Sequence, residues 1–263
     1  MFALYIFFLG SIQANSLQDG AATLSNTITN NFVNSWVFAG IITITAVTTS
    51  LAAFSVFISD RAEGRLKDFA VSPIARWKLT LSYIVASVII SSLLTILAAV
   101  LGQVYLLFSG GEFIGLENAL QLIPLLVFLS AVFSSFACLI ATFVKTSAAF
   151  TSLSIIIGTS VGFLAGIYVP VGSLPSGVAN VVNTLPFAQA AALTRQPFAT
   201  DTLTKISQGS STQTEALKDM YGFNITVGDA TLSTMTILLL LTGLAAICLA
   251  IAVVRMARVL KTV

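Results

Sequence analysis

The sequence predicts an all-α, polytopic integral membrane protein, and two observations carry this prediction. Of the 263 residues, 57% are apolar and only 8% are charged, whereas about 25% of the residues in a soluble domain are charged. Five apolar stretches are also long enough to cross a bilayer, which takes about 20 residues in a helix. So few charges could not cover the surface of a soluble fold of this length, so lipid must be the solvent for much of the chain.

The five predicted spans follow one another from residue 32 onward and contain no Asp, Glu, Lys, Arg or His. Both cysteines, Cys138 and Cys248, lie within them, which favours buried free thiols over a disulfide. The spans run from Phe32 to Ser59, from Leu79 to Phe108, from Leu120 to Val144, from Ser147 to Val169 and from Thr231 to Val254.

The run from Met1 to Ile12 is also apolar, but it has only about half the length of a span. A signal peptide would carry a basic segment before this run and a small-residue cleavage site after it, and the sequence has neither. We therefore expect the second half of a first spanning helix whose beginning is missing from this chain; whether Met1 is the true start stays open. A short interfacial segment is the alternative, although no polar face alternates with the apolar one.

The basic residues between the predicted spans are divided unequally between the two sides of the membrane. If every span crosses fully, nine of the twelve lie on one side, and the other side carries three together with seven of the ten acidic residues. Since cytoplasmic loops hold the excess of Lys and Arg, we expect the loop 60–78 and the C-terminus to be cytoplasmic. The nine are Arg61, Arg65, Lys67, Arg76, Lys78, Lys145, Arg255, Arg258 and Lys261.

The segment 170–192, on the opposite side, fits neither a span nor a free loop. It contains Pro170, Pro175 and Pro186, three of the six prolines in the chain, yet its valines and leucines recur at helical spacing. We expect a re-entrant or interfacial helical segment that dips back from the outer face. The polar stretch 193–230 is expected to be an extracellular loop, and residues 1–263 to form a single transmembrane domain.

The sequence lacks the residues that most catalytic and ion-driven mechanisms need. No G-x-x-x-x-G-K-[ST] motif is present to hold ATP phosphates, and the absence of histidine excludes Ser-His pairs and HExxH zinc sites. The spans carry no ionisable group of the kind that binds a driving proton or sodium ion. We therefore expect no catalytic residue, metal or cofactor in this chain and an energy source outside the membrane. The net charge of +2 also gives no reason to expect a nucleic-acid partner.

Hydroxyl and amide side chains are the polar groups that remain inside the predicted spans. They either line a path for a substrate or hydrogen-bond neighbouring helices and their own backbone, and the sequence leaves both roles open. They include Thr43, Thr45, Thr48, Thr49, Ser91, Ser92 and Gln103.

The loop 60–78 has the pattern of a short amphipathic helix. Asp60 followed by Glu63 resembles a capping pair that starts a helix, and Pro73 would end it. A short helix held between two spans can transmit force from a partner, whereas the alternative is an ordinary basic juxtamembrane loop. The apolar face of the helix would consist of Ala62, Leu66 and Phe69.

Two motifs resemble those of a known family. Residues 63–79, E-G-R-L-K-D-F-A-V-S-P-I-A-R-W-K-L, resemble a signature of the permease subunits of ABC type-2 exporters, a family of drug, antibiotic-peptide and polysaccharide exporters. Residues 166–175, G-I-Y-V-P-V-G-S-L-P, and 185–190, L-P-F-A-Q-A, resemble the element at which that family leaves span five and forms outer re-entrant helices. The positions that carry this second resemblance are Gly166, Pro170, Leu174, Pro175 and Pro186.

The resemblance implies a six-span half-transporter, truncated here in its first span, that dimerises and docks two ATPase subunits. ATP and Mg would be bound by those partner subunits, and the loop would be the coupling helix seated in a groove of the ATPase. Family members usually begin with an amphipathic helix on the inner membrane surface, which this sequence lacks, in agreement with a missing N-terminal part. The coupling residues would be Asp60, Glu63, Gly64, Arg65, Leu66, Phe69 and Pro73.

We therefore expect the permease subunit of an ATP-binding-cassette exporter in a bacterial plasma membrane, paired with a second copy or a related permease. Uncharged spans favour an amphipathic or hydrophobic substrate, such as a drug, an antimicrobial peptide or a lipid-linked molecule. The direction of transport rests on the resemblance alone. Two other classes remain open: an ATP-independent channel, and a membrane immunity or scaffold protein that transports nothing.

Overall fold

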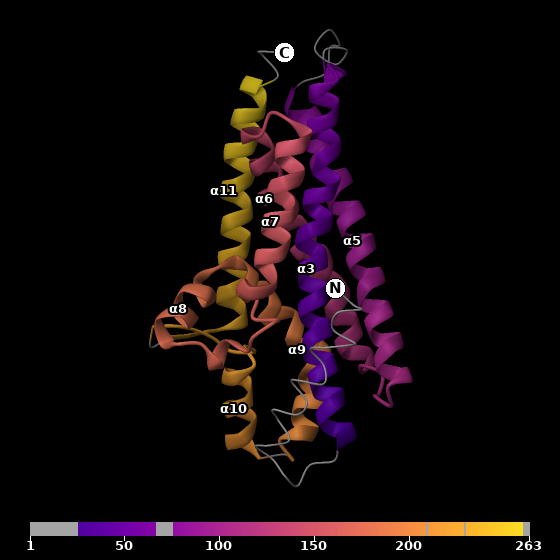
Figure 1. Cartoon of the computed structure of the whole chain (residues 1–263), viewed down its shortest axis with the longest axis vertical. Helices are drawn as coiled ribbons and strands as arrows, with labels where there is room; N and C mark the ends of the chain where they lie inside the picture. Colours follow the sequence, from indigo (N-terminus) through magenta and orange to yellow (C-terminus); the bar gives the residue numbers. More distant parts are fainter. Residues whose placement is uncertain (1–25, 67–75, 209, 229, 260–263) are drawn as a thin grey trace. The chain divides into compact units, whose positions relative to one another are not determined.

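The computed structural model describes residues 26–66, 76–208, 210–228 and 230–259, and this part of the chain is almost entirely α-helical (Figure 1). Five of its helices are long and apolar enough to cross a membrane. The predicted all-α, polytopic membrane fold is therefore confirmed, whereas the predicted half-span Met1–Ile12 lies outside the described residues. The five helices are α3 (Asn26–Ala62), α5 (Arg76–Phe108), α6 (Leu116–Phe143), α7 (Ser147–Leu164) and α11 (Thr234–Val259).

The prolines of the segment 170–192 divide it into two short helices and the start of a longer one. Pro170 and Pro175 each stand directly before a helix, and Pro186 is the first residue of the next one. Proline suits these positions because its φ is already helical and the first amides of a helix need no partner within it. The helices are the 3-10 helix η2 (Val171–Ser173), α8 (Ser176–Thr184) and α9 (Pro186–Ile206).

The stretch 193–230, expected as a loop, is largely helical where the structure describes it. α9 continues without a break past residue 192, and most of its side chains are buried. The Thr, Ser and Gln content of the stretch is typical of a loop, but tertiary packing overrides such weak local preferences. After α9 come α10 (Ser211–Met220) and an antiparallel hairpin of β1 (Ile225–Val227) and β2 (Ala230–Leu232).

The chain folds into two compact units, each assembled from separate stretches of sequence. The first unit contains the start of α3 up to Ile44, residues 96–125 and residues 161–234. The second contains residues 45–95, residues 126–160 and the chain from Met235 onward. The long helices α3, α5 and α6 thus each supply residues to both units.

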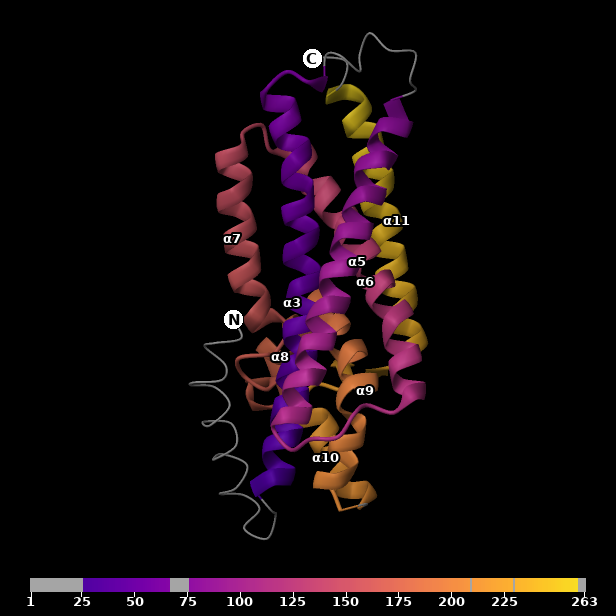
Figure 2. The ribbon, with the colours of Figure 1, turned by 90° about the vertical axis from the view of Figure 1, so that its right-hand side faces the viewer.

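An aromatic cluster lies in the core of the first unit. Phe32 and Trp36 of α3 are fully buried and meet the ring of Tyr221 edge-on, with ring centroids 5.0 and 5.1 Å apart. The indole Nε1 of Trp36 also donates a hydrogen bond of 2.8 Å to the backbone carbonyl of Tyr221. The segment that follows α10 is therefore bound to the first turns of α3, and both views draw α9 beside this part of α3 (Figures 1 and 2).

Hydroxyl groups join α3, α5 and α6 inside the second unit. The Ser91 hydroxyl lies 2.9 Å from that of Thr49 and 3.0 Å from that of Ser50. The Ser87 hydroxyl lies 2.9 Å from that of Ser134. Such groups cross-link closely packed helices in a membrane. Thr49 and Ser91 therefore serve as helix–helix contacts, one of the two roles that the sequence left open.

We expect the bond between Ser87 and Ser134 to contribute a coupling energy of about 0.6 kcal/mol, the average for such bonds between membrane helices. A double-mutant cycle of Ser87→Ala and Ser134→Ala, followed by denaturant unfolding in mixed micelles, measures this energy. Ser82→Ala is the matched control, since the Ser82 hydroxyl is exposed and, among the described residues, bonds only to the Leu79 carbonyl of its own helix. Fully additive losses of stability in the cycle would contradict the proposed cross-link.

Candidate functional site

The first candidate site is the turn that follows α3. The structure corrects the predicted capping role of Asp60, because α3 continues through this residue and ends only at Ala62. The amide of Glu63 still donates to the carbonyl of Ser59 at 2.9 Å, and Gly64 then adopts a φ of +78°. A left-handed glycine just after a helix is a common helix end, so Gly64 determines where α3 stops.

The Asp60 carboxylate anchors this turn. Its Oδ2 accepts a hydrogen bond of 2.7 Å from the hydroxyl of Tyr83 on α5, and its Oδ1 accepts one of 3.1 Å from Arg65. The Tyr83 ring packs edge-on against Phe57 at a centroid distance of 5.2 Å, which holds the hydroxyl in place. The aspartate side chain is only 15% exposed. It therefore joins α3, α5 and the turn through one nearly buried group.

The tip of the turn is exposed. The side chains of Glu63 and Arg65 are 52% and 63% exposed and pair with each other, and a Cβ on Gly64 would meet nothing within 4 Å. Exposed ion pairs of this kind add little stability. Leu66, by contrast, is fully buried. The remaining predicted coupling residues, Phe69 and Pro73, lie outside the described residues.

The second candidate site begins where α7 ends, at Gly166. This glycine has a φ of +63°, and the amides of Ile167 and Tyr168 turn back to the carbonyl of Gly162 at 3.0 and 3.3 Å. A Cβ at Gly166 would collide with Cγ2 of Val171. The helix consequently stops at Leu164, short of the predicted end of this span.

The other predicted outer residues stand at the boundaries of the short helices that follow. Leu174 comes directly after η2, where its amide donates to the carbonyl of Val171 at 3.1 Å. Pro170, Pro175 and Pro186 mark the three helix starts. All five predicted residues thus shape the backbone of the first unit.

Arg195 of α9 holds together the segments that follow α7 and α10. Its guanidinium donates to the carbonyls of Ala165 and Gly166 at 2.9 and 3.0 Å and to that of Gly222 at 2.9 Å. It lies over the Trp36 ring at 5.3 Å, and the side chain is 1% exposed. Burial lowers the pKa of Arg195 to about 9, which leaves it charged at neutral pH. The cation thus satisfies carbonyls at the C-terminal end of α7, where the helix dipole also favours positive charge.

The sequence does not single out Arg195, which is only one of three basic residues on the predicted outer side. A signal is nevertheless present, because this lone arginine directly follows the run A-A-A-L-T at 190–194 in a stretch with helical spacing. An arginine on a helix that packs into a core must find hydrogen-bond acceptors. Which carbonyls it would find is not encoded locally.

The five long apolar helices are those of a multi-pass membrane protein. Residues 2–198 match the family of ABC-2 type transporters, and the chain therefore belongs to this family. The match confirms the resemblance and includes the turn after α3. A comparison with curated proteins found no match. The chain is accordingly a permease component of an ABC-type transporter, whose family implies association with an ABC ATPase subunit and a membrane.

Proposed function

We propose that this chain is the permease subunit of an exporter in a bacterial plasma membrane, with residues 1–263 forming one transmembrane permease domain. The loop 60–78 and the C-terminus lie in the cytoplasm, and the segments 170–192 and 193–230 belong to the outer side. Two permease chains, identical or related, form the path for an amphipathic or hydrophobic substrate. ATP and Mg are bound by the partner ATPase, whose closure drives the change between inward-open and outward-open states.

The anchored turn after α3 is the observation that carries this proposal. A coupling element must be exposed enough to touch the ATPase and rigid enough to pass its movement to the spans. Glu63 and Arg65 supply the exposed tip, and Asp60 supplies the rigid connection to α5 through Tyr83. Arg61 adds a second connection, because its guanidinium donates to the carbonyl of Val144 after α6 at 3.3 Å. A displacement of the tip is therefore transmitted to three helices of the second unit.

The surfaces of the spans support a partner within the membrane. On α7 and α11 most of the apolar segment is exposed in the single chain. Large apolar side chains such as Ile155 and Ile156 of α7 are 62% and 60% exposed. Lipid and a second permease chain are the two environments in which such faces are stable.

A pull-down from native membranes in mild detergent tests the proposal. We expect the wild-type chain to retain an ATPase with a Walker A motif. The double variant Glu63→Ala, Arg65→Ala should retain about tenfold less, since loss of a few central contacts removes most of the energy of an interface. The control is the double variant Glu215→Ala, Lys218→Ala, which removes another pair of opposite charge, 2.8 Å apart and with side chains 60% and 32% exposed, from α10. The control should retain the ATPase in full.

Other outcomes favour the two remaining classes of protein. Conductance or downhill flux from the purified chain, with no ATPase bound, would identify a channel. Capture of a toxin without ATP-dependent movement of any substrate would identify an immunity or scaffold protein. Equal retention of the ATPase by both double variants would show that the turn is not the coupling contact.

A further inference from the structure

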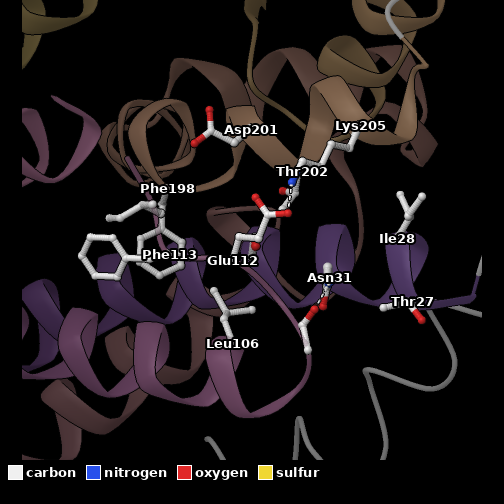
Figure 3. Close-up of a pocket in the computed structure, with 13 residues that line it drawn as sticks. Thr27, Ile28, Asn31, Leu106, Glu112, Phe113, Phe198, Asp201, Thr202 and Lys205 are labelled. Carbon is white, nitrogen blue, oxygen red and sulfur yellow. Dashed lines mark hydrogen bonds and ion pairs between the residues drawn. The ribbon is translucent and has the colours of Figure 1, made fainter. Parts of the chain in front are cut away.

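A pocket of about 210 Å³ in the first unit is lined by charged side chains that already have partners within that unit (Figure 3). It lies between the first turns of α3, the segment that follows α5 and the second half of α9. Lys205 Nζ is 2.6 Å from Glu112 Oε1, and Figure 3 shows these two groups side by side. The Asp201 carboxylate accepts a hydrogen bond of 3.1 Å from the amide of Asn118. The charged groups of this pocket therefore do not require a ligand.

Arg255, near the end of α11, differs from the other arginine side chains that the structure describes. Arg61 and Arg195 donate to backbone carbonyls, and Arg65 pairs with two carboxylates. The guanidinium of Arg255 forms neither a hydrogen bond nor an ion pair with a described residue, although its Nε is buried. Because a buried N–H group without an acceptor costs free energy, Arg255 favours an acceptor that the described residues do not supply.

The guanidinium of Arg255 lies against an exposed aromatic ring. Its Cζ is 3.8 Å from the ring centroid of Phe143, the last residue of α6, and Phe143 is 58% exposed. The ring attracts the cation, and the N–H donors of a guanidinium stay free in this contact because they point in its own plane. The Arg255 side chain is half-buried as a whole. Phe143 therefore supports a planar set of donors that a ligand can reach.

Arg255 lies at the depth where phospholipid headgroups are found. The spanning part of α11 runs from Thr234 to Met256, and at about 1.5 Å per residue Arg255 is about 32 Å from Thr234. The hydrocarbon core of a bilayer is about 30 Å thick, so Arg255 reaches its polar boundary. Ile251, one turn earlier on the same face of α11, is 43% exposed. An acyl chain can therefore lie over Ile251 while the headgroup of that lipid meets the guanidinium.

The charge of the second unit favours a headgroup with net negative charge. Its two described carboxylates, Asp60 and Glu63, both pair with Arg65, so neither is available to the other cations of the unit. Phosphatidylcholine carries a cation of its own beside the phosphate, whereas phosphatidylglycerol does not and can balance the excess positive charge. The cations of this unit that form no ion pair with a described residue include Arg61, Lys78, Lys145 and Arg255.

We propose that Arg255 binds the phosphate of an anionic phospholipid, such as phosphatidylglycerol, in the surrounding bilayer. Two N–H groups of the guanidinium donate to two phosphate oxygens, the bidentate geometry that arginine favours. Phe143 holds the guanidinium in position, and the acyl chain lies over Ile251. This binding requires neither an ATPase nor a transported substrate, so it goes beyond the proposed function and is tested separately from it.

Native mass spectrometry of the full chain in detergent tests the site, because it counts the lipids that remain bound. Phosphatidylglycerol and phosphatidylcholine with identical acyl chains are titrated separately. We expect the first phosphatidylglycerol bound per chain to have a dissociation constant at least about fivefold lower than that of phosphatidylcholine. Inorganic phosphate at millimolar concentration should not displace it, since the acyl chains contribute to binding.

Substitutions at Arg255 separate a specific site from general attraction between charges. Arg255→Gln should weaken phosphatidylglycerol binding about tenfold, and Arg255→Lys about threefold, because an ammonium keeps the charge but not the planar donors. The matched control is Lys78→Gln, which removes an exposed cation of the same unit that lies 5.7 Å from the ring centroid of the exposed Trp77. The control should change binding by less than about twofold.

Phe143 is expected to act as a positioning residue. Phe143→Ala should reduce the preference for phosphatidylglycerol over phosphatidylcholine by about threefold, because the guanidinium loses its support. Phe143→Tyr keeps a ring and should restore the preference. Thermal unfolding of every variant checks that it folds.

Four results would overturn the proposal. Equal affinity for the two lipids would show that the site does not select an anionic headgroup, and equal losses in Arg255→Gln and Lys78→Gln would show general attraction only. Displacement by inorganic phosphate would assign the site to a free anion. Normal lipid binding by Arg255→Gln, together with loss of the ATPase in the pull-down, would assign Arg255 to the ATPase contact instead.

Discussion

Replacing Arg195 with methionine is expected to lower the free energy of unfolding by about 3 to 9 kcal/mol. The substitution leaves the carbonyls of Ala165, Gly166 and Gly222 buried without their donor, and each unsatisfied buried group costs about 1 to 3 kcal/mol. Methionine fills similar volume and keeps the contact with the Trp36 ring, so the loss reports hydrogen bonding more than packing. Denaturant unfolding in mixed micelles measures it.

Two further variants define the cause of this loss. Arg65→Met removes an arginine that is 63% exposed and should cost less than about 1 kcal/mol. Arg195→Lys should lose more stability than Arg65→Met and less than Arg195→Met, because a single ammonium cannot reproduce the planar fork of donors that reaches three carbonyls. Wild-type stability in Arg195→Met would mean that the cost of burying the charge outweighs its hydrogen bonds.

The membrane-spanning helices could be predicted from the sequence because the bilayer imposes a strong constraint. A helix in lipid must satisfy its own backbone and keep charge out of the hydrocarbon core. In the five described spans the charged residues accordingly lie only near the helix ends, as Asp60 and Arg61 do in α3. The ends of these helices are set more locally. α7 stops before Val169 because Gly166 takes a positive φ, and α3 stops after Ala62 because Gly64 does.

The first candidate site shows why a local pattern can be misread. An aspartate three residues before a glutamate is the pattern of a helix start. Here Asp60 lies in the last turn of α3 and Glu63 directly follows the helix, and the glycine after them is the stronger signal. The partner of Asp60 is Tyr83, on another helix. No spacing within the loop encodes that contact.

Arg195 and the pocket depend even more on tertiary structure. The three carbonyls that accept from Arg195 come from two segments far apart in the sequence. The pocket combines Asn31, Glu112 and Asp201 from three separate stretches. Composition predicts that such polar groups lie outside the spans, but only the packing of the first unit determines which of them meet.

Two of the left-handed glycines at helix ends, Gly64 and Gly166, provide a final matched test. Gly64 and Gly166 have φ values of +78° and +63°, but only Gly166 has a side chain in the space that a Cβ would fill, that of Val171. Gly64→Ala should therefore cost about 1 to 2 kcal/mol, the penalty of the left-handed conformation alone. Gly166→Ala should cost about 2 to 5 kcal/mol, because overpacking adds roughly 1 to 3 kcal/mol. Unfolding in mixed micelles measures both.

A second substitution separates strain from packing at Gly166. Val171→Ala removes the methyl groups that the new Cβ would strike, so the double variant Gly166→Ala, Val171→Ala should lose less stability than the sum of the single losses. The same Val171→Ala change should be additive with Gly64→Ala, since nothing lies within 4 Å of that position. Strict additivity at both glycines would show that the Val171 side chain can move aside without loss of stability. The left-handed conformation of Gly166, and not the space beside it, would then be the reason for a glycine where α7 ends.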